Sequence, residues 1–231
     1  MIYETKIQFD KNEVLRYLGY KAGMDIPEDL DNLINKSIDE AYSLINPRGR
    51  IKTLKIDNIS NGRVSFVNSC LIINSEDIIN LLRYSDYATV MAVTIGDKLP
   101  IHIDELFKED EYAEALIFDA IGSEGAEKTA DELNQLVEKE ALDKGYFLTE
   151  RFSPGYGDFE LSFQPQVINE LETKEIGLCV TETNILIPRK SVTAIIGWTR
   201  KKEKSTTEIK CRGCNLSGCQ YRRADHCTFG N

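Results

Sequence analysis

The spacing of apolar residues along the chain predicts several amphipathic helices. Across Glu28–Ile45 apolar residues recur at steps of three and four, which is the spacing of a helix with one buried face. Asp10 stands where a helix N-cap is expected, before a second amphipathic segment, Lys11–Tyr20. Ser75 occupies the same position before Glu76–Tyr84. The first third of the chain is therefore expected to be rich in helices that bury one face.

Runs of β-branched and aromatic residues predict strands between these helices. Arg50–Ile56 and Arg63–Phe66 both have this composition. The segment that joins them contains Asn61 and Gly62, the dipeptide most typical of a tight hairpin. Tyr87–Ile95 is a continuous apolar run, as expected for a strand that is buried on both faces. These segments predict a hairpin beside a central strand.

The second half of the chain is predicted to hold one long helix followed by extended segments. Asp110–Lys144 has helical periodicity, and Gly122 and Gly125 mark either a break or a close approach within it. Thr181–Ile187 and Ser191–Gly197 are expected to be strands. Helices and strands do not alternate regularly, so the expected fold class is α+β, with a twisted, mostly antiparallel sheet flanked by helices.

Composition and charge exclude several classes of protein. The chain has 231 residues, 42% of them hydrophobic, and a formal net charge of −10. Its longest stretch without a charge is Val64–Ser75, which is too short to span a membrane. The net negative charge argues against a general nucleic-acid-binding surface. The first residues lack the pattern of a secretory signal, so a cytoplasmic location is expected.

The C-terminal segment differs from the rest in charge and in cysteine content. Lys and Arg outnumber Asp and Glu there, and we expect a basic, cysteine-rich tail, residues 201–231, after a main domain, residues 1–200. Four closely spaced thiols in a cytoplasmic protein favour a metal centre over disulfides: Cys211, Cys214, Cys219 and Cys227. Their uneven spacing favours an iron–sulfur cluster, such as a 4Fe-4S cluster, over zinc. A zinc site that only holds the tail in place is the structural alternative. Cys70 and Cys179 are expected to be reduced cysteines in the core.

The segment Arg151-Phe-Ser-Pro-Gly-Tyr156 is the clearest candidate for a binding site. Pro154 and Gly155 favour a tight turn, which leaves backbone polar groups without regular partners. Arg151 offers a planar guanidinium for a carboxylate, and Tyr156 offers an aromatic ring with a polar tip. Such a turn is suited to a small zwitterion attached to an aromatic base. A surface turn with a solvated arginine is the alternative interpretation.

Arg151–Tyr156 resembles the Arg-x-x-x-Gly-Tyr signature of the activation, or reactivation, domain of cobalamin-dependent methionine synthase. Further along, Thr181-Glu182-Thr183, Pro188 and Ser191-Val192 resemble the Thr-Glu-Ser…Pro…Ser-Val stretch of that domain. From its residues alone, this second segment is either a sheet edge, a strand across the floor of a cleft, or a simple hairpin. Leu18-Gly19-Tyr20 and the stretch that begins at Asp119 resemble the short, free-standing members of the family.

The resemblance implies a twisted antiparallel sheet with a shallow groove for S-adenosylmethionine. By position, Arg151 is implied to hold the methionine carboxylate, while Pro154, Gly155 and Tyr156 contact the adenosine part. A glutamate of the long helix is implied near the ligand's amino group, either Glu127 or, as the alternate, Glu124. These contacts position the ligand, and no residue is assigned an acid–base role.

The family's domain acts on cobalamin that has been oxidised to the inactive cob(II)alamin form. It supports reduction by flavodoxin or a similar donor and methyl transfer from S-adenosylmethionine. This chain lacks the cobalamin-ligand motif and carries Ile196 where the family's large enzyme has a tyrosine. It is therefore expected to act in trans, as a component serving a separate methionine synthase or other corrinoid protein. The alternatives are a non-catalytic cap or assembly module for a corrinoid protein, and an iron–sulfur electron carrier on the same scaffold.

Overall fold

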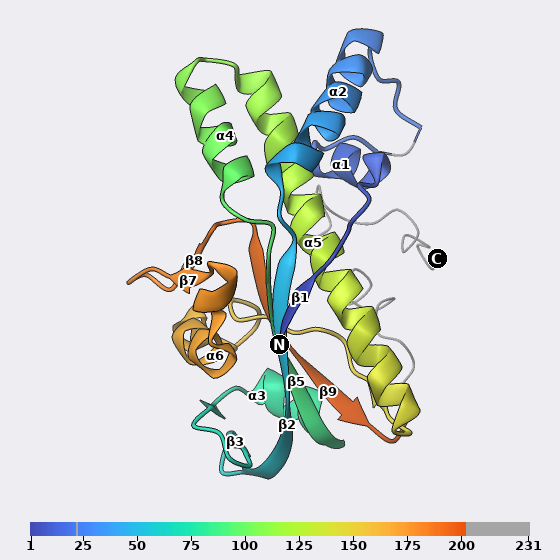
Figure 1. Ribbon diagram of the computed structural model, residues 1–231. Coiled ribbons are helices and arrows are strands. Elements are labelled where there is room, and N and C mark those ends of the chain that lie inside the picture. Colours follow the sequence, from blue (N-terminus) through green and yellow to red (C-terminus); the bar gives the residue numbers. More distant parts are fainter. Residues whose placement is uncertain (22, 202–231) are drawn as a thin grey trace, which may run out of the picture.

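The computed structural model describes residues 1–21 and 23–201 (Figure 1). Within them, the main sheet is built from seven strands: β1 (Ile2–Glu4), β2 (Arg48–Ser60), β3 (Arg63–Phe66), β4 (Ile72–Ile73), β5 (Ser85–Thr94), β6 (Phe147–Leu148) and β9 (Ser191–Thr199). The helices are α1 (Lys11–Tyr17), α2 (Glu28–Leu44), α3 (Glu76–Leu82), α4 (Lys98–Lys108), α5 (Tyr112–Asp143) and α6 (Gln164–Leu171). A separate hairpin joins β7 (Cys179–Val180) to β8 (Leu186–Ile187), and two short 3-10 turns flank α6, at Leu161–Phe163 and Thr173–Ile176.

The sheet is antiparallel throughout, in the order β4-β3-β2-β5-β9-β6, with β1 paired to the start of β2. Asn61 and Gly62 both have positive φ in the β2–β3 turn, as their hairpin signal predicts. The α+β fold class and the antiparallel sheet are confirmed. No helix of the described residues is long and apolar enough to cross a membrane.

The central strand β5 is buried on both faces because helices cover both sides of the sheet. Val90 and Ala92 face a core cluster that includes residues of α3 and α6. Met91 and Val93 point the other way, toward Leu133 of α5. Because side chains on both faces of β5 are buried, its sequence is a nearly continuous run of apolar residues.

Helix α5 extends past the sheet into a second group of helices. In Figure 1 it runs from the end where α1, α2 and α4 gather to the far end of the sheet. Gly122 and Gly125 do not break it, because α5 is continuous across both. A Cβ at Gly125 would lie 3.1 Å from the Phe9 ring, so this glycine allows the segment before α1 to approach the helix closely. Of the two readings of this glycine pair, close approach is confirmed.

Two local predictions are wrong. Thr181–Ile187 is not one strand, because residues 181–185 form the turn of the β7–β8 hairpin and Asn184 has a φ of 63°. Cys70 and Cys179 are exposed rather than in the core. Cys70 lies in the connection between β3 and β4, and Cys179 points outward from β7 while its neighbour Leu178 is buried.

Candidate functional site

The turn that follows Arg151 is attached to the side of the sheet. Phe152 exchanges two backbone hydrogen bonds with Ile195 of β9, at 3.0 and 2.8 Å. Pro154 is buried, whereas Gly155 and Tyr156 are exposed. Gly155 has a φ of 99°, a conformation that side chains resist, and its N–H donates to the Phe159 carbonyl at 2.6 Å. The turn is therefore fixed to β9 at one end and closed on itself at the other.

The Asp158 carboxylate connects this turn to helix α3, and the Asp77 carboxylate in turn accepts from the backbone N–H of Asp158 at 3.1 Å. Asp158 accepts hydrogen bonds from the Ser75 hydroxyl at 2.5 Å and from the backbone N–H of Glu76 at 2.6 Å. A further bond comes from the N–H of Asp77 at 3.2 Å. The Ser75 hydroxyl and these N–H groups, which favour negative charge at the start of a helix, hold the pKa of Asp158 below its usual value. The position of the turn thus depends on a helix cap that is distant in sequence.

Arg151 reaches from the start of the turn to the surface of α5. Its Nη2 lies 2.8 Å from Oδ1 of Asp131 and 3.1 Å from Oε2 of Glu127. The Arg151 side chain is 20% exposed, while the two carboxylates are about half exposed. Glu127 and Asp131 are one helical turn apart, so they present a pair of acids on one face of α5. The structure brings together Arg151 and Glu127, the two charged residues predicted for the site.

Helix α1 packs across α5 beside this pair. The Arg16 guanidinium lies 4.3 Å from the centre of the Tyr17 ring and pairs with Glu13 at 2.8 Å. Burial raises the pKa of Tyr17, and the negative charges of Glu127 and Glu124 add to the rise. Tyr17 therefore interacts electrostatically with Glu127, and only its place on an amphipathic helix marks it in the sequence.

Glu124 differs from Glu127 in its surroundings. It is only 2% exposed, whereas the Glu127 side chain is 46% exposed. Burial raises the pKa of Glu124 to about 7, and the like charges of Glu13 and Asp10 contribute. Lys128 opposes the shift from 3.9 Å. A carboxyl group with a pKa near neutrality thus precedes the acid pair on α5, one helical turn before Glu127.

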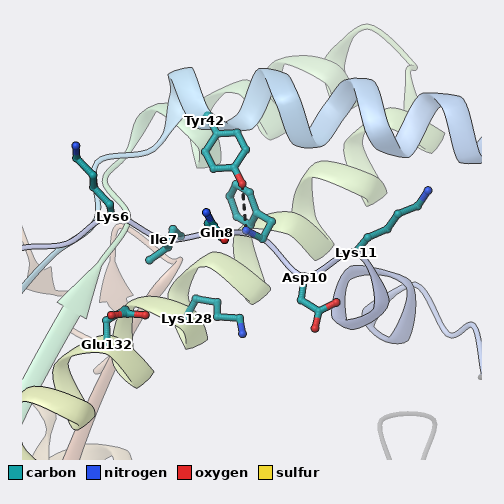
Figure 2. Close-up of a pocket in the computed structure, with 9 residues that line it drawn as sticks. Lys6, Ile7, Gln8, Asp10, Lys11, Tyr42, Lys128 and Glu132 are labelled. Carbon is teal, nitrogen blue, oxygen red and sulfur yellow. Dashed lines mark hydrogen bonds between the residues drawn. The ribbon is translucent and has the colours of Figure 1, made fainter.

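A groove of about 840 Å³ opens beside the site, between the segment that leads into α1, helix α2 and helix α5 (Figure 2). Lys128 and Glu132 line it, and each follows directly after one of the two acids that hold Arg151. Lys6, Lys11, Tyr42 and the backbone around Phe9 complete the lining. None of the predicted site residues lines this groove, so the groove and the Arg151 pair occupy adjacent faces of α5.

The remaining predicted residues are not gathered at this pair. Tyr156 is 66% exposed, and its ring lies 6.4 Å from that of Phe152. Thr181, Glu182 and Thr183 lie in the β7–β8 turn, so of the three readings of this segment the simple hairpin is the observed one. Ile196 is fully buried in β9 against α5, so it offers no polar group to a ligand.

No metal-binding group is found among the described residues, in which no three His, Cys, Asp or Glu side chains gather suitably. The four cysteines predicted to bind metal, Cys211, Cys214, Cys219 and Cys227, lie outside these residues, as does most of the predicted tail.

The fold is similar to that in a solved structure described as the crystal structure of the MetH reactivation domain bound to AdoHcy. The TM-score is 0.63 at 15% sequence identity, and the match covers 88% of this chain and 80% of that one. No protein-family model matches the sequence, and no curated protein matches it. At this identity the likeness establishes the shared fold.

Proposed function

We propose that this chain binds S-adenosylmethionine at the Arg151–Glu127 pair and supports reactivation of a separate corrinoid protein. One observation carries the proposal: the guanidinium of Arg151, at the start of the Pro-Gly turn, lies 3.1 Å from the Glu127 carboxylate on α5. The likeness of the whole fold to a reactivation domain with AdoHcy bound supports it. S-adenosylmethionine is the methyl donor of which AdoHcy is the product.

An amino-acid zwitterion suits the Arg151–Glu127 pair because its two opposite charges can replace the contact between Arg151 and Glu127. The ligand carboxylate would bind one edge of the Arg151 guanidinium through two N–H donors, and the ligand ammonium would bind the Glu127 carboxylate. Asp131 would keep its contact of 2.8 Å with Arg151 and hold the guanidinium in place. No charge is left without a partner, which is the condition for binding charged groups at a half-buried site.

The adenosine part is proposed to lie along the turn. The exposed Gly155 lets the adenosine part approach the turn closely, and Tyr156 offers an exposed ring on which a base can stack. Because Pro154 is buried and Asp158 is bonded to α3, the turn is already ordered. Less conformational entropy is then lost on binding.

The proposed reaction occurs on the partner's cobalt. A reductant such as flavodoxin supplies one electron to cob(II)alamin. The resulting cob(I)alamin attacks the sulfonium methyl group, so that a Co–C bond forms, the S–CH₃ bond breaks, and S-adenosylhomocysteine leaves. This chain would hold the sulfonium for that attack, which is catalysis by positioning.

Equilibrium binding of S-adenosylmethionine tests the proposal. We expect Arg151→Ala to lower affinity by about 30-fold, because the ligand carboxylate loses its charged partner at this half-buried site. Arg189→Ala is the matched control, since Arg189 also pairs with a helix carboxylate, that of Asp104 at 2.7 Å. Equal affinity of the Arg151→Ala variant and the wild type would overturn the proposal. Binding without methyl transfer to a reduced corrinoid protein would instead favour the non-catalytic cap.

We also propose that the cysteine-rich tail binds a metal, with an iron–sulfur cluster favoured over zinc. Four thiols within seventeen residues support this: Cys211, Cys214, Cys219 and Cys227. A reducible cluster would make the chain an electron carrier to the partner's cobalt. An absorption spectrum of anaerobically purified protein that bleaches on reduction would support the cluster, and a colourless protein with one zinc per chain would refute it.

A further inference from the structure

Glu124 is an acid whose burial the proposed contacts do not explain. Its side chain is 3% exposed, and its Oε1 has no hydrogen-bond partner among the described residues. The backbone of Asp10 provides a hydrogen bond to the carboxyl group, and the Lys128 ammonium is 3.9 Å away. Burying a carboxyl group with one oxygen unsatisfied is costly, so its retention at this place calls for a role.

The position of Glu124 connects it to the ligand pair. It precedes Glu127 by three residues on α5, so the two side chains are neighbours on the helix surface. From α1 and its start, the charged or titratable groups that face it are Asp10, Glu13 and Tyr17. From α5 itself the facing charge is Lys128. Glu124 is therefore one helical turn from Glu127 on α5, and its other charged neighbours come from α1 and its start.

We propose, on the basis of the function proposed above, that Glu124 is a selectivity residue whose charge favours the cationic sulfonium ligand over the neutral thioether product. Both ligands carry the amino-acid zwitterion that Arg151 and Glu127 would hold. They differ in the methyl group and in one positive charge at sulfur. A buried negative charge one helical turn from Glu127 acts on that difference, because screening by water is weak there.

The same geometry makes the selectivity depend on pH. Because burial brings the pKa of Glu124 to about 7, the group is largely neutral at pH 5.5 and mostly charged at pH 7.5. A bound cation stabilises the charged form and lowers this pKa, so binding of S-adenosylmethionine releases a proton near neutral pH. S-adenosylhomocysteine lacks the sulfonium charge and should leave the pKa nearly unchanged. After methyl transfer the product would then be held less tightly than the substrate.

The test compares the affinities of S-adenosylmethionine and S-adenosylhomocysteine between pH 5.5 and 7.5. For wild type we expect the ratio of the two affinities to rise about fivefold in favour of the sulfonium ligand, as a pKa lowered by about one unit on binding requires. Glu124→Gln should abolish this rise while still binding both ligands. Glu138→Gln, which alters an exposed glutamate of the same helix, should behave as wild type.

The two proposals fail in different ways. A wild-type ratio that does not change with pH, or a rise that persists in Glu124→Gln, would overturn the role of Glu124 but not ligand binding. Failure of the wild type to bind either ligand at any pH would overturn the proposed function itself. If Glu124→Gln does not fold, the role of Glu124 is tested in the wild type by measuring proton release on ligand binding. Calorimetry at pH 7 in buffers of different ionisation enthalpy gives the number of protons released. Release with the sulfonium ligand alone supports the inference, and equal release with both ligands contradicts it.

Discussion

The Asp158 carboxylate accepts a hydrogen bond from the Ser75 hydroxyl at 2.5 Å, across 83 residues of sequence. Ser75 is itself the N-cap of α3, with its Oγ accepting from the N–H of Ile78 at 3.1 Å. The turn that carries Tyr156 is thus fixed to the same helix start that Ser75 caps. The shape of the proposed ligand site therefore depends on a contact that lies outside it.

Asp158→Asn should loosen this turn. The pKa of Asp158 is lower in the folded protein, so its contribution to stability is present at neutral pH and lost as pH falls through the folded pKa. We expect the variant to melt below wild type at pH 7 and the difference to vanish in strong acid. Thermal melts across pH measure this, with Asp143→Asn, an exposed position at the end of α5, as the control. An equal deficit at every pH would show that the carboxylate charge is not involved.

Glu127→Gln should weaken S-adenosylmethionine binding by about tenfold, because a neutral amide is a poorer partner for the ligand ammonium. The variant also loses one of the two acids that hold Arg151. Calorimetric titration gives the affinity, and Glu138→Gln serves as the matched control on the same helix. Unchanged binding by Glu127→Gln would remove this residue from the site.

Glu124→Gln should stabilise the protein above neutral pH. The pKa of Glu124 is raised by folding to about 7, so the folded state binds more protons than the unfolded state between pH 4.5 and 7, and wild-type stability falls across that range. The Glu124→Gln variant has no carboxyl group to titrate at this position, so its stability does not fall in this way between pH 4.5 and 7. Its melting temperature should match wild type near pH 4.5 and exceed it by a few degrees at pH 8. A constant difference at all pH values would contradict the buried, titrating carboxyl group.

Replacing Cys211 and Cys214 with serine should remove bound metal and leave the main domain folded. Metal analysis gives the content per chain, and near-ultraviolet dichroism of Trp198, which is 1% exposed, reports on the fold. The control changes the two exposed cysteines, Cys70 and Cys179, and should keep the metal. If the fold is lost together with the metal, the tail instead holds a structural zinc site that stabilises the fold.

Local sequence signals predicted local structure well. Asn61 and Gly62 fixed the β2–β3 turn because few residues adopt its positive φ. Tyr87–Ile95 predicted β5 because a strand covered by helices on both faces is mostly apolar on both, with Thr89 and Thr94 as its buried polar residues. In contrast, Thr181–Ile187 has strand composition but folds as a hairpin, since the Thr181–Asn184 turn bonds outweigh β propensity there.

The site was only partly accessible from the sequence. Arg151 and its turn carry a recognisable signature, and the resemblance pointed to Glu127. The third charged member, Asp131, and the nearby Tyr17 were not predicted, because Asp131 meets Arg151 only where the segment after β6 reaches α5, and Tyr17 meets the charge of Glu127 only where α1 packs on α5. The burial of Glu124 likewise depends on where α1 crosses α5. Helix periodicity shows that one face is buried, but it does not say which partner buries it.

The measurement that most directly tests the central claim compares S-adenosylmethionine with its decarboxylated form, which keeps the sulfonium and the amine but lacks the carboxylate. If Arg151 holds that carboxylate, wild type should prefer S-adenosylmethionine by about 30-fold, and Arg151→Ala should bind the two ligands equally. The claim is contradicted if wild type shows no preference, or if the preference survives in Arg151→Ala.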